Sequence, residues 1–153
     1  MDAIQDFEDF LELLDRHEVH YLIIGGLAFI YHAKPRFTKD IDIWLGPGPD
    51  NLARANAALA EFGSPHLLNQ ADDGEILQLG VAPNRIDLLR EASPVAFEDA
   101  WSRRVEGTYG RARACWIAIE DLLAIKERID HPRHREDARV LRLVLERRRR
   151  RRE

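Results

Sequence analysis

The stretch from residue 21 to residue 45 limits the fold of this chain more than any other part of the sequence. It opens on four apolar residues, Tyr21 to Ile24, which predict a buried strand. Gly25 and Gly26 interrupt this apolar run, and the next six residues predict a short helix. Residues 38–45 then predict a second strand. The unit is therefore expected to be a strand, a glycine turn, a short helix and a strand.

The second predicted strand carries two carboxylates on one face. Asp40 and Asp42 alternate with Ile41, Ile43 and Leu45, and successive side chains on a strand point to opposite faces. Neighbouring carboxylates repel each other, and burial adds several kcal/mol of desolvation cost unless a partner is present. The usual partner is a divalent cation, and Mg²⁺ favours one or two carboxylates together with substrate phosphates.

The two glycines indicate the other half of the same chemistry. Glycine lets the backbone approach a phosphate closely, and the amides at the start of a helix favour an anion. A metal at Asp40 and Asp42 beside a phosphate at Gly25 and Gly26 indicates nucleotidyl transfer. Taken singly, the carboxylates fit a solvated strand face and the glycines fit an ordinary turn. The hypothesis rests on their combination and order.

Four motifs give the chain a resemblance to a known family. They are Gly25–Gly26, Arg36-Phe-Thr38-Lys-Asp40-Ile-Asp42-Ile, Arg85-Ile-Asp87-Leu-Leu and Asp121-Leu-Leu-Ala-Ile-Lys126, and they cover most of residues 18–140. With these motifs the chain resembles the minimal nucleotidyltransferases of the DNA polymerase β superfamily. Within that superfamily it is most similar to the AbiEii-type toxins of bacterial toxin–antitoxin and phage-defence systems. The resemblance implies an α+β fold, with a mixed sheet flanked by helices and a C-terminal helical segment.

The resemblance also implies a metal-dependent active site. Asp40, Asp42 and Asp87 would be the catalytic carboxylates and would hold two Mg²⁺ ions, with Mn²⁺ as a substitute. Asp87 would bind the ion nearest the attacking hydroxyl and help to remove its proton. Residues 75–81 and 85–89 predict a hairpin that brings Asp87 into the sheet of the other two. On spacing alone Asp87 fits an exposed strand carboxylate, and only the resemblance favours the catalytic role.

Nucleotide binding is expected at Gly25, Gly26, Arg36, Thr38 and Lys126. In related proteins a lysine in the context of Lys126 faces the active site and contacts the triphosphate. The alternative is a solvated cation near the C-terminus of a helix, where the helix dipole favours it. Arg36 would reach a phosphate or pair with the carboxylates, and otherwise it is a solvated loop arginine.

Two departures from the family pattern bear on this site. A common form of the superfamily has a serine where this chain has Leu27, so backbone amides must supply the grip on a phosphate there. Relatives often carry an aspartate where this chain has His134, between Pro132 and Asp137. No cysteine lies near enough in sequence to complete a zinc site with His131 and His134, so both histidines are expected at the surface.

The remaining pattern predicts elements along the whole chain. Apolar residues at helical spacing predict an amphipathic helix over residues 4–16. Asp50 and Asn51 are candidate caps of a helix over residues 52–62, which Gly63 ends. Further helices are expected over residues 95–103, 119–128 and 136–148, strands over 105–109 and 113–117, a loop over 66–73, and turns at 82–84 and around Gly107 and Gly110.

Length and composition indicate one globular domain. The chain has 153 residues, of which 45% are hydrophobic and 33% charged. Its single cysteine, Cys115, excludes an intramolecular disulfide framework and is expected to be a buried, inert thiol. The acidic N-terminus does not resemble a signal peptide, and no apolar run is long enough to span a membrane. We therefore expect a cytoplasmic protein without a membrane partner.

The C-terminus is a block of like charge, Arg147 through Arg152. The net charge is −4, and the last seven residues contribute six positive charges and one negative charge, so residues 1–146 carry −9. We predict a nucleotidyltransferase domain over residues 1–146 and an arginine-rich tail over 147–153. Such a tail is usually disordered and favours RNA or DNA phosphates, but it could equally extend the last helix or be solvated without a function.

Two functions of different classes follow from the resemblance. The first is a Mg²⁺-dependent enzyme that moves NMP from an NTP such as ATP to an acceptor hydroxyl. The acceptor would be an RNA end (tRNA included) or a protein side chain, and an antitoxin or a helical partner protein would accompany a toxin role. The second is a catalytically silent module that binds a nucleotide or a partner for regulation.

Overall fold

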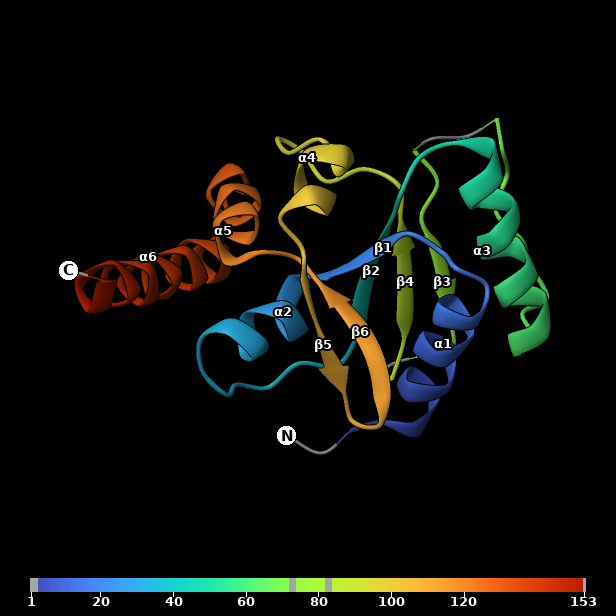
Figure 1. Cartoon of the computed structure of the whole chain (residues 1–153), viewed down its shortest axis with the longest axis horizontal. Coiled ribbons are helices and arrows are strands. Elements are labelled where there is room, and N and C mark those ends of the chain that lie inside the picture. The colour runs from blue at the N-terminus through green and yellow to red at the C-terminus, as the bar shows by residue number, and fades with distance from the viewer. Residues whose placement is uncertain (1–2, 72–73, 82–83, 153) are drawn as a thin grey trace.

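The computed structural model describes residues 3–71, 74–81 and 84–152. Within these residues the chain forms a six-stranded sheet flanked by helices (Figure 1). The strands are β1 Tyr21–Ile24, β2 Ile41–Leu45, β3 Leu77–Leu79, β4 Ile86–Leu89, β5 Val105–Tyr109 and β6 Ala112–Trp116. The helices are α1 Gln5–Arg16, α2 Gly25–His32, α3 Pro49–Phe62, α4 Phe97–Ser102, α5 Ile119–Arg128 and α6 Pro132–Arg152.

The sheet is mixed, with the strand order β3-β4-β2-β1-β6-β5. Two hairpins, β3–β4 and β5–β6, lie at its edges, and β1 and β2 form an antiparallel pair at its centre. The contacts of β2 with β4 and of β1 with β6 are parallel. This architecture confirms the predicted α+β class with a C-terminal helical segment.

The central strands are buried because helices cover them. In Figure 1, α1 and α3 lie together at one side, whereas α2, α5 and α6 form a second group. The two central strands supply Leu22, Ile23, Ile41 and Ile43, all with 0% exposure. The Ile41–Ile43 alternation of β2 therefore faces the core, as the sequence pattern predicts.

Several element boundaries differ from the prediction. Helix α2 begins at Gly25 itself, so the two glycines are its first residues and not a separate turn. Strand β2 begins at Ile41, because residues 34–40 lie in an irregular segment before it. The expected hairpin of Asp87 is present, although β3 is shorter than predicted. The predicted turn at 82–84 lies partly outside the described residues, as does the end of the 66–73 loop.

The capping prediction for α3 is wrong. The N-cap is Gly48, and no side chain caps this helix end. The buried Asn51 side chain instead holds the start of β1 to the end of β2, since its Oδ1 accepts from the His20 amide at 2.8 Å and its Nδ2 donates to the Gly46 carbonyl at 2.9 Å. The C-terminal prediction is confirmed, because Gly63 ends the helix in the left-handed conformation at φ 94°.

The last helix is longer than the sequence indicated. Helix α6 runs from Pro132 to Arg152, so the arginine block continues the helix without a break and extends away from the sheet (Figure 1). The predicted division at residue 147 is therefore not marked by a break in the helix. Among the described residues, no helix is both long and apolar enough to cross a membrane.

Candidate active site

The site lies where three neighbouring strands share one register. Ile24 of β1 pairs with Asp42 of β2, and Asp42 pairs with Asp87 of β4. Gly25 follows Ile24 directly, so the start of α2 lies beside the first carboxylate. Asp40 is the last residue before β2 and lies close to Asp87, since Arg85 contacts Asp40 Oδ2 at 3.2 Å and Asp87 Oδ1 at 2.7 Å. The sheet thus brings together all three carboxylates predicted from the sequence.

Two features of position 25 favour glycine: a left-handed backbone conformation and the lack of room for a Cβ atom. Its φ of 71° lies in the left-handed region, which favours glycine, and a Cβ built on it would lie 2.2 Å from Asp42 Oδ2. A Cβ on Gly26 would lie 2.8 Å from Thr38 Oγ1 and 3.2 Å from Arg36 Nη2. The glycines therefore let the first backbone groups of α2 approach the carboxylate, the hydroxyl and the guanidinium.

Replacing Gly25 with alanine is expected to destabilise the protein and to weaken nucleotide binding at least about 10-fold. The positive φ alone costs roughly 1–2 kcal/mol, and the new methyl group displaces the Asp42 carboxylate. Gly63→Ala is the matched control, because its φ is also positive but a Cβ there meets nothing within 4 Å. Chemical denaturation and NTP titration of both variants check this. Equal NTP affinity in the two variants would contradict the assigned role of Gly25.

The positive charges near Asp42 do not balance its burial and the neighbouring carboxylates. Burial, and then the charges of Asp87 and Asp40, raise the pKa of Asp42 to about 6, although Lys126 and Arg85 oppose the shift. One oxygen of Asp40, Oδ1, is buried without a hydrogen-bond partner. Asp40 and Asp42 thus present a desolvated pair of hard oxygen ligands, which is what a Mg²⁺ or Mn²⁺ ion requires.

Asp87 differs from Asp42 because it forms an ion pair with Arg85, which neutralises its charge. The Arg85 guanidinium donates to both oxygens of Asp87, at 2.7 Å and 3.0 Å, and reaches Asp40 Oδ2 at 3.2 Å. Among residues 3–71, 74–81 and 84–152, no three His, Cys, Asp or Glu side chains are arranged to hold a metal. The residues therefore fit one cation at Asp40 and Asp42, and a second at Asp87 requires Arg85 to move.

A buried cationic cluster faces the carboxylates. Lys126 is only 3% exposed, and its Nζ lies 3.0 Å from Asp137 Oδ2. Arg36 Nη2 donates to the same oxygen at 2.9 Å, and the guanidinium lies 5.0 Å from the centroid of the Phe29 ring. Burial lowers the pKa of Lys126, whereas the bond to Asp137 raises it. Asp137 therefore fixes the two cations that the sequence predicted for phosphate binding.

The prediction of a surface position holds only in part for His134, which is half-buried and contacts the site. Its Nδ1 lies 3.2 Å from Lys126 Nζ, and burial followed by the charge of Lys126 lowers its pKa. His131, in contrast, is exposed as expected. The first turn of α6 folds back over the end of α5, and this tertiary contact places His134 in the site.

Two hollows meet at Asp42. The polar hollow has a volume of 310 Å³, and the apolar hollow has 380 Å³. Gly25, Asp42, Lys126 and His134 line both of them. The polar hollow is completed by Gly26, Arg36, Phe37, Thr38, Lys39, Asp40 and Arg133, and the apolar one by Ile24, Leu89, Glu91, Ala92, Ser93, Leu122, Ile125, Arg128 and Ile129. Every predicted nucleotide-binding residue therefore lines the polar hollow.

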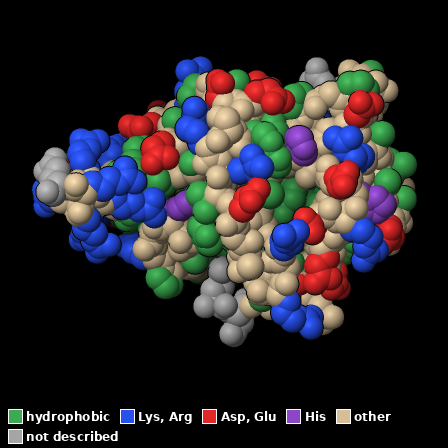
Figure 2. Space-filling model, viewed as in Figure 1, with side chains coloured by type: hydrophobic (Ala, Val, Ile, Leu, Met, Phe, Trp, Pro, Cys, Tyr) green, Lys and Arg blue, Asp and Glu red, His purple; other side chains and the backbone are tan. Residues whose placement is uncertain are grey.

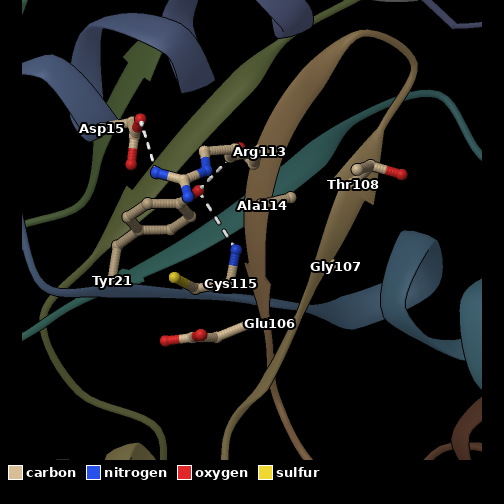
Figure 3. A pocket seen from close by; sticks show the side chains of 8 residues that line it. All are labelled: Asp15, Tyr21, Glu106, Gly107, Thr108, Arg113, Ala114 and Cys115. Carbon is tan, nitrogen blue, oxygen red and sulfur yellow. Dashed lines mark hydrogen bonds and ion pairs between the residues drawn. The ribbon is translucent and has the colours of Figure 1, made fainter.

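A separate hollow of 490 Å³ contains none of these groups. It lies beside the β5–β6 hairpin, and Figure 3 shows Tyr21, Arg113 and Cys115 around it. The Tyr21 hydroxyl accepts from the Cys115 amide at 3.2 Å, and Arg113 Nη1 is 4.0 Å from Asp15 Oδ2. Cys115 is half-buried and not fully buried as predicted, and burial raises the pKa of its thiol, which fits an inert group.

The fold is that of the nucleotidyltransferases. The solved structures similar to this chain include the lincosamide antibiotic adenylyltransferase LnuA with lincomycin bound (TM-score 0.62, 16% identity, 94% of this chain and 99% of that chain). They also include ANT(2")-Ia in complex with adenylyl-2"-tobramycin (0.58, 15%, 91% and 87%) and a nucleotidyltransferase-like protein from Paracoccidioides brasiliensis (0.53, 12%, 93% and 76%). No family model and no curated protein matches the chain.

Proposed function

We propose that this protein is a metal-dependent nucleotidyltransferase that moves NMP from an NTP to an acceptor hydroxyl. The observation that carries the proposal is that groups suited to a metal ion and groups suited to a triphosphate lie side by side at Asp42. On one side lie Asp42, whose pKa is raised, and Asp40, whose buried Oδ1 has no hydrogen-bond partner. On the other side lie the glycine start of α2 and the cations Lys126 and Arg36, which suit a triphosphate.

The polar hollow would hold the triphosphate. The amides of Gly25 and Gly26 open α2, where the helix dipole favours an anion. Arg36, Thr38 and Lys126 add a guanidinium, a hydroxyl and an ammonium. When bound at Asp40 and Asp42, a divalent cation would supply charge neutralisation to the phosphates and lower the pKa of the attacking hydroxyl.

The transfer itself would be a displacement at the α-phosphorus. The acceptor oxygen forms the new bond, the bond to the bridging oxygen breaks, and pyrophosphate leaves with that oxygen. The hydroxyl proton passes to a carboxylate, for which Asp87 is the candidate once Arg85 has moved. Because attacking and leaving oxygens lie roughly in line, a leaving group in the polar hollow puts the acceptor in the apolar hollow.

The acceptor hydroxyl belongs to one of three classes of molecule. An RNA end and a protein side chain follow from the resemblance, which also motivates a toxin role with an antitoxin partner. LnuA and ANT(2")-Ia, whose structures contain lincomycin and adenylyl-2"-tobramycin, add a small hydroxylated molecule to these classes. The adenylyl group of these neighbours makes ATP the first nucleotide to test.

The second candidate is a silent nucleotide-binding or partner-binding module of the same fold. It is favoured by one observation, the Arg85 guanidinium that occupies Asp87 and reaches Asp40. A module of this kind would bind NTP without transferring NMP.

Label transfer separates the two candidates. The protein is incubated with each α-³²P-NTP, with Mg²⁺ or Mn²⁺, and with cell RNA, protein extract or small-molecule alcohols as acceptors. We expect label on one acceptor class from the native protein and none from an Asp40→Ala/Asp42→Ala variant. Calorimetric NTP binding without any transfer would establish the silent module, and absence of binding would remove the nucleotide function.

A further inference from the structure

Helix α6 connects the candidate site to a distant surface. Its first turn carries Arg133 and His134, which line the polar hollow, and its last residue described is Arg152. At 1.5 Å per residue, the distance from Arg133 to Arg151 along the helix is about 27 Å. These two residues are 18 positions apart, or five turns of 3.6 residues, so they lie on the same side of the helix. Arg147 lies within about 40° of this line.

Three arginines in the first half of α6 are neutralised by acidic partners, whereas those at the end of α6 are not. Arg135, Arg139 and Arg142 pair with Asp130, Glu136 and Glu127. For Arg147 to Arg152 there is no acidic partner within 4.0 Å among the described parts of the chain. Figure 2 shows Lys and Arg side chains gathered over the end of α6 at the left of the view, whereas on the rest of that face Lys and Arg side chains are mixed with Asp and Glu side chains.

The chemistry of this surface fits a polyanion. Residues 147–152 are six consecutive arginines, of which all but Arg148 are exposed. An interface with a protein normally has aromatic or aliphatic anchors at its centre, and a membrane-bound helix has an apolar face. Residues 146–152 provide neither. A phosphodiester backbone needs only positive charge, and a strand stacked as in a duplex carries a charge about every 3.4 Å, so at most roughly eight charges fit along α6 from Arg133 to Arg151.

We propose that the exposed arginines of α6 bind the backbone of a single-stranded nucleic acid and direct its end into the candidate site. This inference rests on the proposed function, because it names the acceptor as a nucleic acid strand. The net charge of −9 on residues 1–146 repels a polyanion from the rest of the surface. The strand therefore follows α6, and its terminal nucleoside enters the apolar hollow beside Asp42.

The test compares two triple variants with equal charge loss. One is Arg147→Gln/Arg150→Gln/Arg151→Gln on α6, three exposed arginines that lie within about 100° of the line from Arg133. The control is Arg16→Gln/Arg111→Gln/Arg113→Gln, whose arginines are exposed on α1 and on the β5–β6 hairpin. Neither triple includes a residue of the candidate site. Binding of a fluorescent single-stranded RNA of about 12 nucleotides is measured without NTP, over about 50–300 mM KCl, where salt dependence counts the phosphate contacts.

The native protein is expected to show a slope of log K against log salt of about −3, from four contacts (Arg133, Arg147, Arg150 and Arg151) at about 0.7 each. The α6 triple should reduce this slope by about 2 and weaken binding at least about 10-fold at low salt, while the control keeps the native slope. Equal losses in both triples would overturn the proposal, as would tighter binding of polyglutamate than of RNA, which would indicate an acidic protein partner. NTP binding is measured separately, so a protein that binds RNA but no NTP would refute only the proposed function.

Discussion

Replacing Asp42 with asparagine is expected to abolish nucleotide transfer and, at the same time, to make the metal-free protein more stable at pH 7.5. Loss of transfer should exceed about 1,000-fold, because a carboxylate ligand to the cation is removed. The gain in stability follows from the pKa of Asp42, which burial and the neighbouring Asp87 and Asp40 raise to about 6. The ordinary value in an unfolded chain is about 3.9.

The sign of this effect depends on pH. The native protein binds the proton more tightly than the unfolded chain, so it loses stability as pH rises from about 4 through 6, and the penalty then stays constant. Two pKa units correspond to about 3 kcal/mol, and partial exposure of Asp42 reduces this to roughly 1–3 kcal/mol. Asparagine removes the penalty, so its advantage at pH 7.5 should shrink at pH 4.5.

Urea unfolding in EDTA at both pH values measures this difference. Glu12→Gln is the control, since it removes one exposed charge from the middle of α1. Mn²⁺ should raise the melting temperature of the native protein and of the control but not that of Asp42→Asn. A metal-free Asp42→Asn protein that is less stable than native at pH 7.5 would mean that the carboxylate is already paired.

Replacing Asp137 with alanine is expected to destabilise the protein by about 3–5 kcal/mol. Asp137 is 3% exposed and accepts from both Lys126 and Arg36, so its loss leaves a buried ammonium without a carboxylate. Asp130→Ala is the control, because it breaks a surface pair with Arg135 and should cost less than about 1 kcal/mol. Denaturant unfolding of both variants checks the difference.

A paired replacement separates stability from binding. Lys126→Met/Asp137→Leu removes the buried pair and leaves Arg36 as the remaining cation, whose side chain is 20% exposed and reaches solvent. The variant is therefore expected to recover the larger part of the stability, since apolar residues of similar size often replace a buried ion pair without loss. NTP affinity should still fall at least about 10-fold, because a triphosphate contact is missing. If the double variant bound NTP as tightly as the native protein, Lys126 would be a structural residue and not a phosphate ligand.

Local patterns predicted the centre of the molecule well. The alternation of Asp40 and Asp42 with Ile41 and Ile43 fixed both the core face and the site face of β2. The pair of Arg85 with Asp87 was also readable, since residues two apart on a strand share a face. The sequence motif predicts a role for the carboxylate alone, and the structure adds the arginine that neutralises it.

The contacts that local sequence patterns did not predict are set by packing between segments that are distant in the chain. His134 enters the site because α6 turns back over α5, and no local pattern specifies that turn. Asp137 pairs with Arg36 across 101 positions of the chain. Asp50 and Asn51 have side chains typical of helix caps, but the Asn51 amide instead donates to the carbonyls of His20 and Gly46, which flank β1 and β2. The helical state of the arginine block depends on the helix before it, which extends by one bond per residue once formed.

The shared register of β1, β2 and β4 ties the assembly of the site to the folding of the core. A slip of β2 by one residue would turn Ile41 and Ile43 toward the site and would bury Asp40 and Asp42 among aliphatic side chains. Such a misfolded chain would lose its hydrophobic core and its carboxylates together. A form of these strands in the wrong register therefore cannot keep the carboxylates in place, and the cooperative folding of the core maintains the geometry of the candidate site.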